Sequence, residues 1–343
     1  MDKIYIISFT KNGAELSLKL KKLYPDAEVY GKYGDENIKL LDKDIKSFVS
    51  GIFNKSKAII FISALGIAVR AVAPCIISKD KDAAVIVLDD TGRYVIPVLS
   101  GHIGGANEMA VEIAEYIYAE PVITTATDRN KKFAVDVWAC KNNLYIDDIS
   151  MIKEVSSRIL NNENVGFISH YEVLGSIPKG VIADNQCECG IVIGNDDKEK
   201  PFKYTMNLIP KEYVLGIGAR KGAEYNNLKD FAERILKENN IDKRKILAIT
   251  SIDIKKDEKA IIKLAEELNV PFITYSADKL AEVQGDFSSS NFVKNITGVD
   301  NVCERASVCY GETKLIVKKT SENGFTIAVS YKLWQGSFKG ENL

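Results

Sequence analysis

Apolar runs and amphipathic stretches alternate along the first 140 residues of the chain. A turn at residues 11–13 leads into a helix that extends to about residue 23. A second helix begins near Gly104 and places apolar side chains on one face, at Met109, Ala110, Ile113, Ala114 and Ile117. Runs of strand length, rich in isoleucine and valine, occupy residues 3–9, 57–63, 84–88, 94–99 and 121–125. This alternation predicts a mostly parallel sheet covered by helices.

The same alternation returns after residue 212. Strands are predicted over residues 213–219, 245–250 and 271–275. The helix after the first strand buries Leu228, Phe231, Ala232, Ile235 and Leu236, and the next helix buries Ile261, Leu264, Ala265 and Leu268. Near the end, runs at 314–317 and 326–330 are split by Glu322-Asn323-Gly324, which predicts a β-hairpin.

The stretch between these two parts has a weaker pattern. One helix over residues 151–160 precedes short strand-like runs near Val165, Val181 and Gly190, with many turn residues between them. The sequence therefore predicts two mostly parallel-sheet α/β domains joined by a small mixed α/β middle segment. The expected boundaries are 1–140 for the N-terminal domain, 141–211 for the middle segment and 212–343 for the C-terminal domain.

Composition narrows the class of protein. The 343 residues include 46 basic and 47 acidic side chains, so the net charge of −1 argues against a general nucleic-acid surface. No stretch approaches the roughly 20 apolar residues that span a bilayer, and the N-terminus lacks the apolar region of a signal peptide. A cytoplasmic protein is expected. Among the six cysteines only Cys187 and Cys189 lie close together, and no second pair completes a metal site.

The two histidines stand in different settings. His102 lies in Ser100-Gly101-His102-Ile103-Gly104-Gly105, between a predicted strand and the helix after it, where open α/β sheets bind ligands. Glycines let the backbone approach a ligand, and an imidazole beside helix-start N–H groups suits a general base with an oxyanion site. The alternative is a turn histidine that only caps the helix. His170 is expected at the surface.

Four other polar residues of the N-terminal domain each allow a structural and a functional interpretation. Glu108, in the first turn of the helix after the glycines, is either a helix-start acid or a partner of His102 in acid/base chemistry. Arg70 is a charge in the apolar run 66–74, which needs either an internal salt bridge or a carboxylate ligand. Thr125 and Asp128 follow a predicted strand and either bind polar substrate groups or form a turn.

The last part holds three further candidate segments. The loop 216–222 carries Gly216, Gly218 and the cations Arg220 and Lys221 after a strand. Its Gly-x-Gly lacks a full dinucleotide fingerprint, whereas the two cations suit carboxylate or phosphate. A second strand end carries Ser251 and Lys255, and the acid Glu258 marks the next helix start. Glu304 is expected at the start of another helix, after Cys303, which is interpreted as core filling.

Taken together in this order, these segments resemble the cobalt-precorrin-5A hydrolases, the CbiG family. The resemblance covers nearly the whole chain. In the first part it rests on GIAVRAVAP (66–74), LSGHIGGANE (99–108), PVITTATD (121–128) and FAVD (133–136). In the last part it rests on GIGARKG (216–222), Ser251-x-Asp253-x-Lys255-x-x-Glu258 and GVDNVCERA (298–306).

The resemblance implies an enzyme acting on a cobalt corrinoid that bears a δ-lactone on ring A. Water opens the lactone, acetaldehyde leaves, and cobalt-precorrin-5B remains. No cofactor is implied, because cobalt is part of the substrate. Besides the corrinoid, neighbouring enzymes of the pathway and a second copy of the chain are the expected partners, whereas nucleic acid and membrane are not. Candidate catalytic residues are His102, Glu108 and Glu258, which the sequence does not rank.

The candidate substrate-binding residues lie in the same segments. They are Arg70, Ser100, Gly101, Gly104, Gly105, Thr125, Asp128, Gly216, Gly218, Arg220, Lys221, Ser251, Lys255 and Glu304. Two alternatives stay open. One is a corrinoid carrier or chaperone without catalysis, in which the C-terminal domain only binds tetrapyrrole. The other is a nucleotide-dependent enzyme that uses residues 216–222 as a phosphate loop, which the missing third glycine disfavours.

Overall fold

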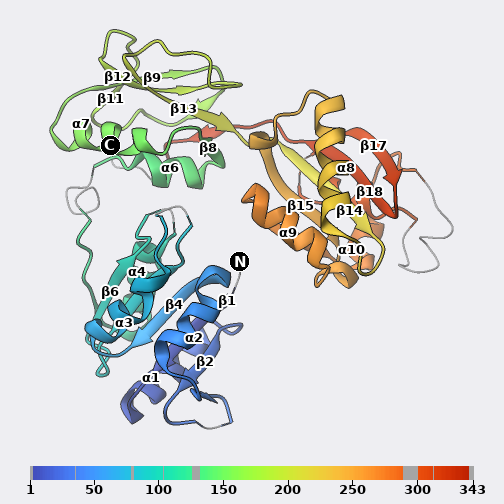
Figure 1. Ribbon diagram of the computed structural model, residues 1–343. Coiled ribbons are helices and arrows are strands. Elements are labelled where there is room, and N and C mark those ends of the chain that lie inside the picture. Colours follow the sequence, from blue (N-terminus) through green and yellow to red (C-terminus); the bar gives the residue numbers. More distant parts are fainter. Residues whose placement is uncertain are drawn as a thin grey trace. The chain divides into compact units, whose positions relative to one another are not determined.

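A computed structural model describes residues 3–34, 36–78, 81–102, 104–125, 132–288, 300–311 and 313–339. The chain divides into two compact units, Met1–Val137 and Trp138–Leu343 (Figure 1). Among the described residues, no helix has both the length and the apolar character needed to cross a membrane.

The first unit is built on a seven-stranded sheet with the order β3-β2-β1-β4-β5-β6-β7. Its strands are β1 (Lys3–Ser8), β2 (Glu28–Gly31), β3 (Lys39–Leu40), β4 (Ser56–Ile62), β5 (Ala84–Leu88), β6 (Tyr94–Leu99) and β7 (Glu120–Pro121). The first five are parallel to one another, whereas β6 runs antiparallel to β5, with Val85 opposite Leu99. The carboxyl end of β6 therefore lies at the edge of the sheet where β4 and β5 begin.

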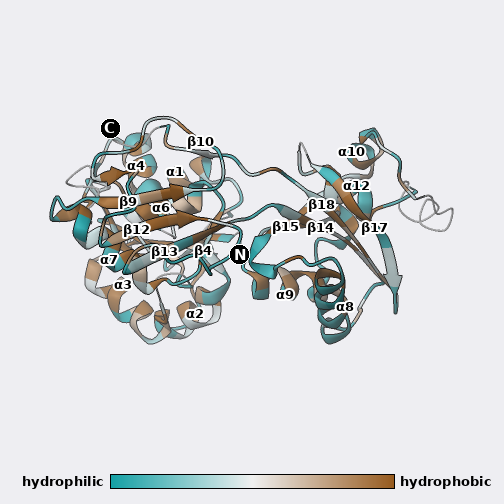
Figure 2. Ribbon diagram, turned by 90° about the horizontal axis from the view of Figure 1, so that it is seen from above, coloured by the Kyte–Doolittle hydropathy of each residue, from teal (hydrophilic) through white to brown (hydrophobic). Residues whose placement is uncertain are grey.

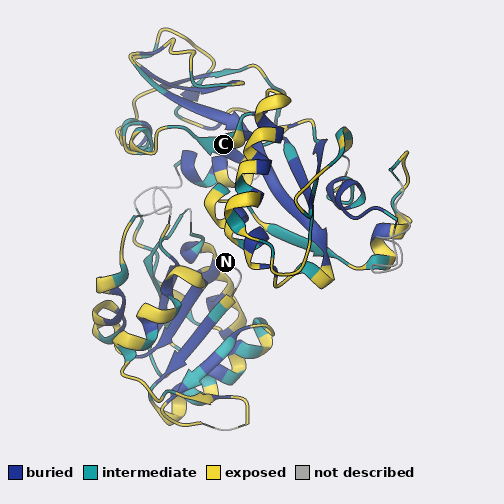
Figure 3. Cartoon of the chain, turned by 45° about the vertical axis from the view of Figure 1, so that its right-hand side comes forward, coloured by how far each residue is buried: buried dark blue, intermediate teal, exposed yellow. Residues whose placement is uncertain are grey.

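Helices cover both faces of this sheet. On one face, α1 (Lys11–Leu23) and α4 (Ala106–Ile117) pack against Ile6, Ile60 and Ile86. On the other, α2 (Ile45–Ile52) and α3 (Leu65–Val72) pack against Ile7, Phe61 and Val85. Strands buried on both faces are typical of parallel sheets, and Figure 3 shows them enclosed. Short 3₁₀ turns, η1 (Phe53–Lys55) and η2 (Ala73–Cys75), follow α2 and α3.

The second unit begins with a five-stranded sheet in the order β11-β9-β12-β13-β8. Its elements are α6 (Val135–Lys141), which starts in the first unit, β8 (Leu144–Ile146), α7 (Ser150–Leu160), β9 (Val165–Ser169), β11 (Val181–Ile182), β12 (Cys189–Ile193) and β13 (Tyr204–Pro210). Only β8 is antiparallel to its neighbour.

A second five-stranded sheet follows, in the order β16-β15-β14-β18-β17. Its strands are β14 (Tyr213–Ala219), β15 (Ile246–Ile252), β16 (Phe272–Tyr275), β17 (Lys314–Glu322) and β18 (Phe325–Tyr331). The helices are α8 (Tyr225–Glu238), α9 (Lys259–Leu268), α10 (Ala277–Glu282) and α12 (Cys303–Val308), with η3 (Lys243–Lys245) and η4 (Asp253–Lys255) between strands and helices. The first two helices form one core with the sheet, and α10 and α12 cover Ile252 in another. The outer side of α8 is polar (Figure 2).

The chain after β18 returns to the middle segment of the same unit, where it completes a separate two-stranded sheet. There β19 (Gly336–Ser337) pairs with β10 (Val173–Leu174), and Trp138 donates its indole N–H to the carbonyl of Ser337 at 2.8 Å. The ring of Phe338 stacks on that of Trp138 with centroids 4.7 Å apart, and both side chains are buried. Glu212 lies between β13 and β14, in the short segment that joins the two five-stranded sheets. It forms a buried ion pair with Lys245. These contacts make the tail part of the core of the middle segment.

The structure confirms the predicted fold class and most of the predicted elements. The predicted strand at 121–125 is wrong in extent, because β7 ends at Pro121 and the following described residues form no strand. The predicted hairpin is confirmed. Asn323 and Gly324 have φ angles of 49° and 86°, as a tight turn between β17 and β18 requires.

Candidate active site

The loop after β6 is folded tightly on itself. Ser100 adopts a left-handed φ of 55°, and its carbonyl accepts a hydrogen bond from the N–H of Ala106 at 3.1 Å. A side chain at Gly104 is excluded, since its Cβ would lie 2.3 Å from the Cβ of Ser100. At Gly101 a Cβ would lie 2.7 Å from the amide oxygen of Asn107. The glycines therefore set the loop's own path, which fixes the position of His102 at the start of α4.

His102 pairs with an acid that the list of candidates did not include. Its Nδ1 lies 3.1 Å from Oδ2 of Asp136, in the first turn of α6, and the two side chains are only 15% and 11% exposed. Burial raises the pKa of Asp136, but the hydrogen bond and charge of His102, with backbone N–H groups of α6, outweigh it and lower that pKa. The carboxylate is thus ionised at neutral pH.

An ionised carboxylate can only accept hydrogen bonds, so the proton of the neutral His102 ring belongs on Nδ1. The lone pair is then on Nε2, the nitrogen that can take a proton from water. This arrangement of acid, imidazole and reacting atom is the one that orients a general base in hydrolases. The residue at the N-cap of α4 is Gly105 rather than His102, and the His102 side chain bonds to Asp136.

The sequence predicted that backbone N–H groups of this loop could stabilise an oxyanion, and the structure leaves fewer of them available. The N–H of Gly105 donates to the carbonyl of His102 at 2.9 Å, so it serves the loop itself. Within the described ranges, the N–H of Gly104 has no acceptor. Gly104 is therefore the better candidate for an oxyanion donor, and Gly105 has a structural part.

Glu108 lies on the face of α4 that borders a groove of about 400 Å³. The groove is lined by Asn107, Glu108, Val111, Glu112, Glu115 and Ile123. The amide of Asn107 donates to Thr125 Oγ1 at 2.9 Å, which brings the predicted Thr125 to the same helix start. Glu112 and Glu115 make this groove a poor place for an anionic ligand. Asp128 lies outside the described residues.

Arg70 is exposed in the last turn of α3, on the opposite face of the sheet from α4. Its guanidinium donates to the carbonyl of Gly66 at 3.3 Å. The alternative of an internal salt bridge is not seen, since Arg70 has no acidic partner in the part of the chain that the structure describes. An exposed guanidinium without an acid remains available for an anionic ligand.

In the second unit the ends of β14 and β15 carry the predicted cations. Arg220 and Lys221 are exposed after β14, and Lys255 is half-buried after β15. The two loops are joined, because the carboxylate of Glu258 accepts a hydrogen bond from the N–H of Gly222 at 3.2 Å. The structure thus brings the four residues to one edge of the sheet. Glu258 itself is buried and orders the loop.

Four residues predicted to bind substrate are part of the internal packing of this unit. Glu304 is fully buried, and its carboxylate accepts hydrogen bonds from Ser288 and from the N–H of Lys319. The buried hydroxyl of Ser251 donates to the carbonyl of Ile217 at 2.6 Å. Added Cβ atoms at Gly216 and Gly218 would lie 1.8 Å from the Cys303 carbonyl oxygen and 2.5 Å from Thr326 Oγ1. Internal contacts therefore give each of the four a structural role, and their binding of substrate stays a prediction.

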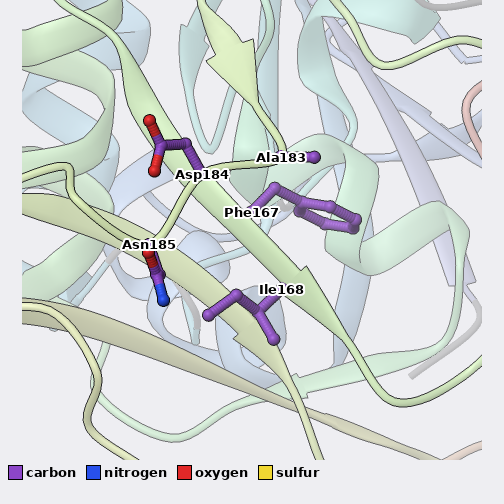
Figure 4. A pocket seen from close by; sticks show the side chains of 5 residues that line it. All are labelled: Phe167, Ile168, Ala183, Asp184 and Asn185. Carbon is purple, nitrogen blue, oxygen red and sulfur yellow. The ribbon is translucent and has the colours of Figure 1, made fainter.

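The sequence also predicts the settings of His170 and Cys303. His170 is exposed and pairs with Glu199, and Cys303 is buried, with the pKa of its thiol raised by burial to about 11. A further cavity, of about 430 Å³, lies in the middle segment and is lined by Phe167, Ile168 and residues 183–185 (Figure 4). No candidate residue lines it.

Asp136 had a weak signal in the sequence. It stands in the FAVD segment, which the resemblance uses, but an acid in a helix's first turn is ordinarily a dipole partner. Its distance of 34 residues from His102 is spanned by α4, β7 and the chain into α6. Only the folded chain brings the two together.

The chain is similar to known proteins along nearly its whole length. Three family profiles match in order: Cobalamin synthesis G N-terminal over residues 47–128, Cobalamin biosynthesis central region over 133–210 and Cobalamin synthesis G C-terminus over 213–330. A cobalt-precorrin-5A hydrolase from Salmonella typhimurium is 31% identical and covers 96% of this chain and 97% of its own. One from Priestia megaterium is 30% identical and covers 95% and 94%.

Among solved structures, a cobalamin biosynthesis protein G homologue from Sulfolobus solfataricus has 25% identity and a TM-score of 0.43, covering 96% of this chain and 97% of that one. The full-length identity to the two hydrolases is the finding that decides the family. This chain belongs to the cobalt-precorrin-5A hydrolase (CbiG) family.

Proposed function

We propose that this protein hydrolyses cobalt-precorrin-5A, opening the ring A δ-lactone with loss of acetaldehyde to give cobalt-precorrin-5B. The observation that carries the proposal is His102, held by the ionised Asp136 on a loop that glycines shape, in a chain that is similar to named hydrolases over nearly its whole length. Cobalt is part of the substrate, and the reaction uses water as its second reactant.

In the first step His102 Nε2 takes a proton from water as the water oxygen bonds to the lactone carbonyl carbon. The tetrahedral oxyanion that forms is stabilised by nearby donors, for which the N–H of Gly104 is the candidate. The acyl–oxygen bond then breaks, leaving a ring A carboxylate and an alkoxide that takes up the proton. The imidazolium paired with Asp136 is the natural donor for that proton.

In the second step the new hydroxyl loses its proton, and its carbon–oxygen bond becomes the carbonyl of acetaldehyde. The electron pair of the broken carbon–carbon bond goes to the ring carbon, which takes up a proton. A group that exchanges protons is needed at both ends. His102 serves the hydroxyl, and Glu108, in the first turn of α4, is the candidate for the other proton.

The corrinoid substrate bears several carboxylates. Each unit carries cations suited to carboxylates, Arg70 in the first and Arg220, Lys221 and Lys255 in the second, and none of them forms an ion pair within the described ranges. The buried Glu258 is proposed to keep the Arg220 loop in place, which removes it from the proposed catalytic residues.

A corrinoid carrier without catalysis is the second candidate. The cationic edge of β14 and β15 would serve a carrier as well as an enzyme, whereas the pairing of His102 with Asp136 has no part in carrying. Purified protein incubated anaerobically with cobalt-precorrin-5A, with an aldehyde-trapping reagent present, separates the two. Release of one acetaldehyde for each corrinoid supports the hydrolase, and bound but unchanged corrinoid supports the carrier.

A further inference from the structure

Two loops of the first unit meet at one edge of its sheet. Because β6 is antiparallel to β5, the chain leaves β6 at Ser100 beside the residues that enter β5. The hydroxyl of Ser100 donates to the carbonyl of Asp82 at 2.8 Å. The carboxylate of Asp82 in turn accepts from the N–H groups of Ile77 at 2.8 Å and Ser78 at 3.3 Å. Asp82 therefore ties the segment 76–78 to the loop that carries His102.

The tied segment exposes apolar side chains. Ile76 and Ile77 are 46% and 64% exposed, although they follow α3, whose inner side is buried against the sheet. Val69, on the outer side of α3, is exposed as well. Two adjacent exposed isoleucines next to a candidate catalytic loop indicate a surface that is covered when a ligand binds.

Charge favours an anionic ligand on this side of His102 and disfavours it on the other. Arg70 and Lys81 are exposed beside Ile76 and Ile77 in the chain, and neither forms an ion pair with any described residue. Across the loop, Glu112 and Glu115 line the groove along α4, beyond Glu108 in the first turn of the helix. A flat, apolar molecule rimmed by carboxylates matches the first side and is repelled from the second.

We propose that Ile76 and Ile77 form the seat for the face of the corrinoid macrocycle, with Arg70 and Lys81 meeting its carboxylates and the ring A lactone toward His102. This inference rests on the function proposed above. It assigns substrate recognition to a segment, 76–78 with Lys81 and Asp82, that lies outside the motifs singled out in the sequence. The catalytic loop and the seat are then one structure, joined through Asp82.

The test is equilibrium dialysis against anaerobically prepared cobalt-precorrin-5A. Every variant also carries His102→Ala, so that the ligand is not consumed. Ile77→Ser is expected to weaken binding about tenfold and the pair Ile76→Ser with Ile77→Ser about 30- to 100-fold, since each isoleucine loses apolar contact. Leu40→Ser is the matched control, because Leu40 is 58% exposed on β3, at the far end of the same sheet. It should bind as the parent does.

Two outcomes separate this inference from the proposed function. If wild-type protein releases acetaldehyde and the isoleucine variants bind like the parent, the seat is wrong and the hydrolase stands. If wild-type protein binds the corrinoid but releases no acetaldehyde, the hydrolase is wrong, and the binding series still decides the seat. Equal thermal unfolding of all variants shows that the exposed positions leave the fold intact.

Discussion

The loop after β6 and the loop after β14 look alike in sequence and differ in structure. Each joins a strand to a helix and carries two or more glycines beside charged or titratable residues. In the first, Gly101 and Gly104 make room for the loop's own backbone and side chains, and so position His102. In the second, Gly216 and Gly218 make room for α12 and for β18, and only Arg220 and Lys221 remain for a ligand. A glycine's role depends on which atom lies where its side chain would be.

The largest effect is expected at the first loop. His102→Ala should reduce acetaldehyde release by at least about 1,000-fold and change corrinoid affinity by less than about tenfold, because it removes a general base and no binding group. Single-turnover trapping of acetaldehyde measures the first quantity and dialysis the second. His170→Ala is the matched control, since that histidine is exposed and paired with Glu199. Turnover of His102→Ala within a few-fold of wild type would contradict the role.

At the second loop the largest effect is expected on stability. Gly216→Ala should lower the free energy of unfolding by about 3 kcal/mol, because the added Cβ forces α12 away from β14. Urea unfolding followed by tryptophan fluorescence measures it, as Trp138 and Trp334 both belong to this unit. Gly194→Ala, whose Cβ meets ordinary contacts of 3.4 Å or more, should stay within about 1 kcal/mol of wild type. Equal losses for the two would refute the packing argument.

Asp136→Asn tests whether the acid positions the first loop's histidine. The rate should fall about 10- to 100-fold, by analogy with other partners that orient a reactive histidine. Without the negative charge, protonation of the imidazole is less favourable, so the acid limb of the rate profile should move to lower pH. A uniform loss of rate with the limb unmoved would indicate a structural role only.

The same pair predicts how stability depends on pH. The pKa of Asp136 is lower in the folded protein than its ordinary value near 4, so its pairing contributes stability above that range. This contribution should be lost as the pH falls from about 4 through the lower pKa of Asp136 in the folded protein. Urea titrations between about pH 3 and pH 7 should therefore show a steeper acid loss for wild type than for Asp136→Asn.

The smallest effect is expected at the second loop's cations. Arg220→Gln should weaken corrinoid binding about three- to tenfold and leave the rate at saturating substrate unchanged, because it removes one exposed charge contact. The loss should shrink as salt is added. Lys237→Gln, at the last turn of α8, is the control for a charge lost elsewhere in the unit. An affinity equal to that of wild type would place Arg220 outside the binding surface.

Periodicity predicted the parts of the fold that depend on local pattern. The apolar faces of α4 and α8 and the strands β5 and β6 are where the sequence places them, since a buried face requires its own repeat of apolar side chains. The direction of β6 was not predictable from that pattern, because the order of apolar residues in a strand does not depend on whether it runs parallel or antiparallel to its neighbour. That reversal brings Ser100, in the loop that carries His102, to Asp82.

The pattern also could not predict contacts between residues that are distant in sequence. Glu304 looks like a helix-start acid, and only the fold shows that it accepts hydrogen bonds from Ser288 and Lys319. The tail residues Trp334 and Phe338 show no sign in the sequence that they complete a core that begins at Trp138. Such contacts depend on tertiary packing, which local propensity does not encode.

The central claim is that His102 activates water for attack on the lactone carbonyl. A single turnover of cobalt-precorrin-5A in H₂¹⁸O, with the corrinoid product analysed by mass spectrometry, tests it most directly. One labelled oxygen is expected in the ring A carboxylate of the product. A corrinoid product without label would mean that water does not attack that carbon, and would contradict the mechanism.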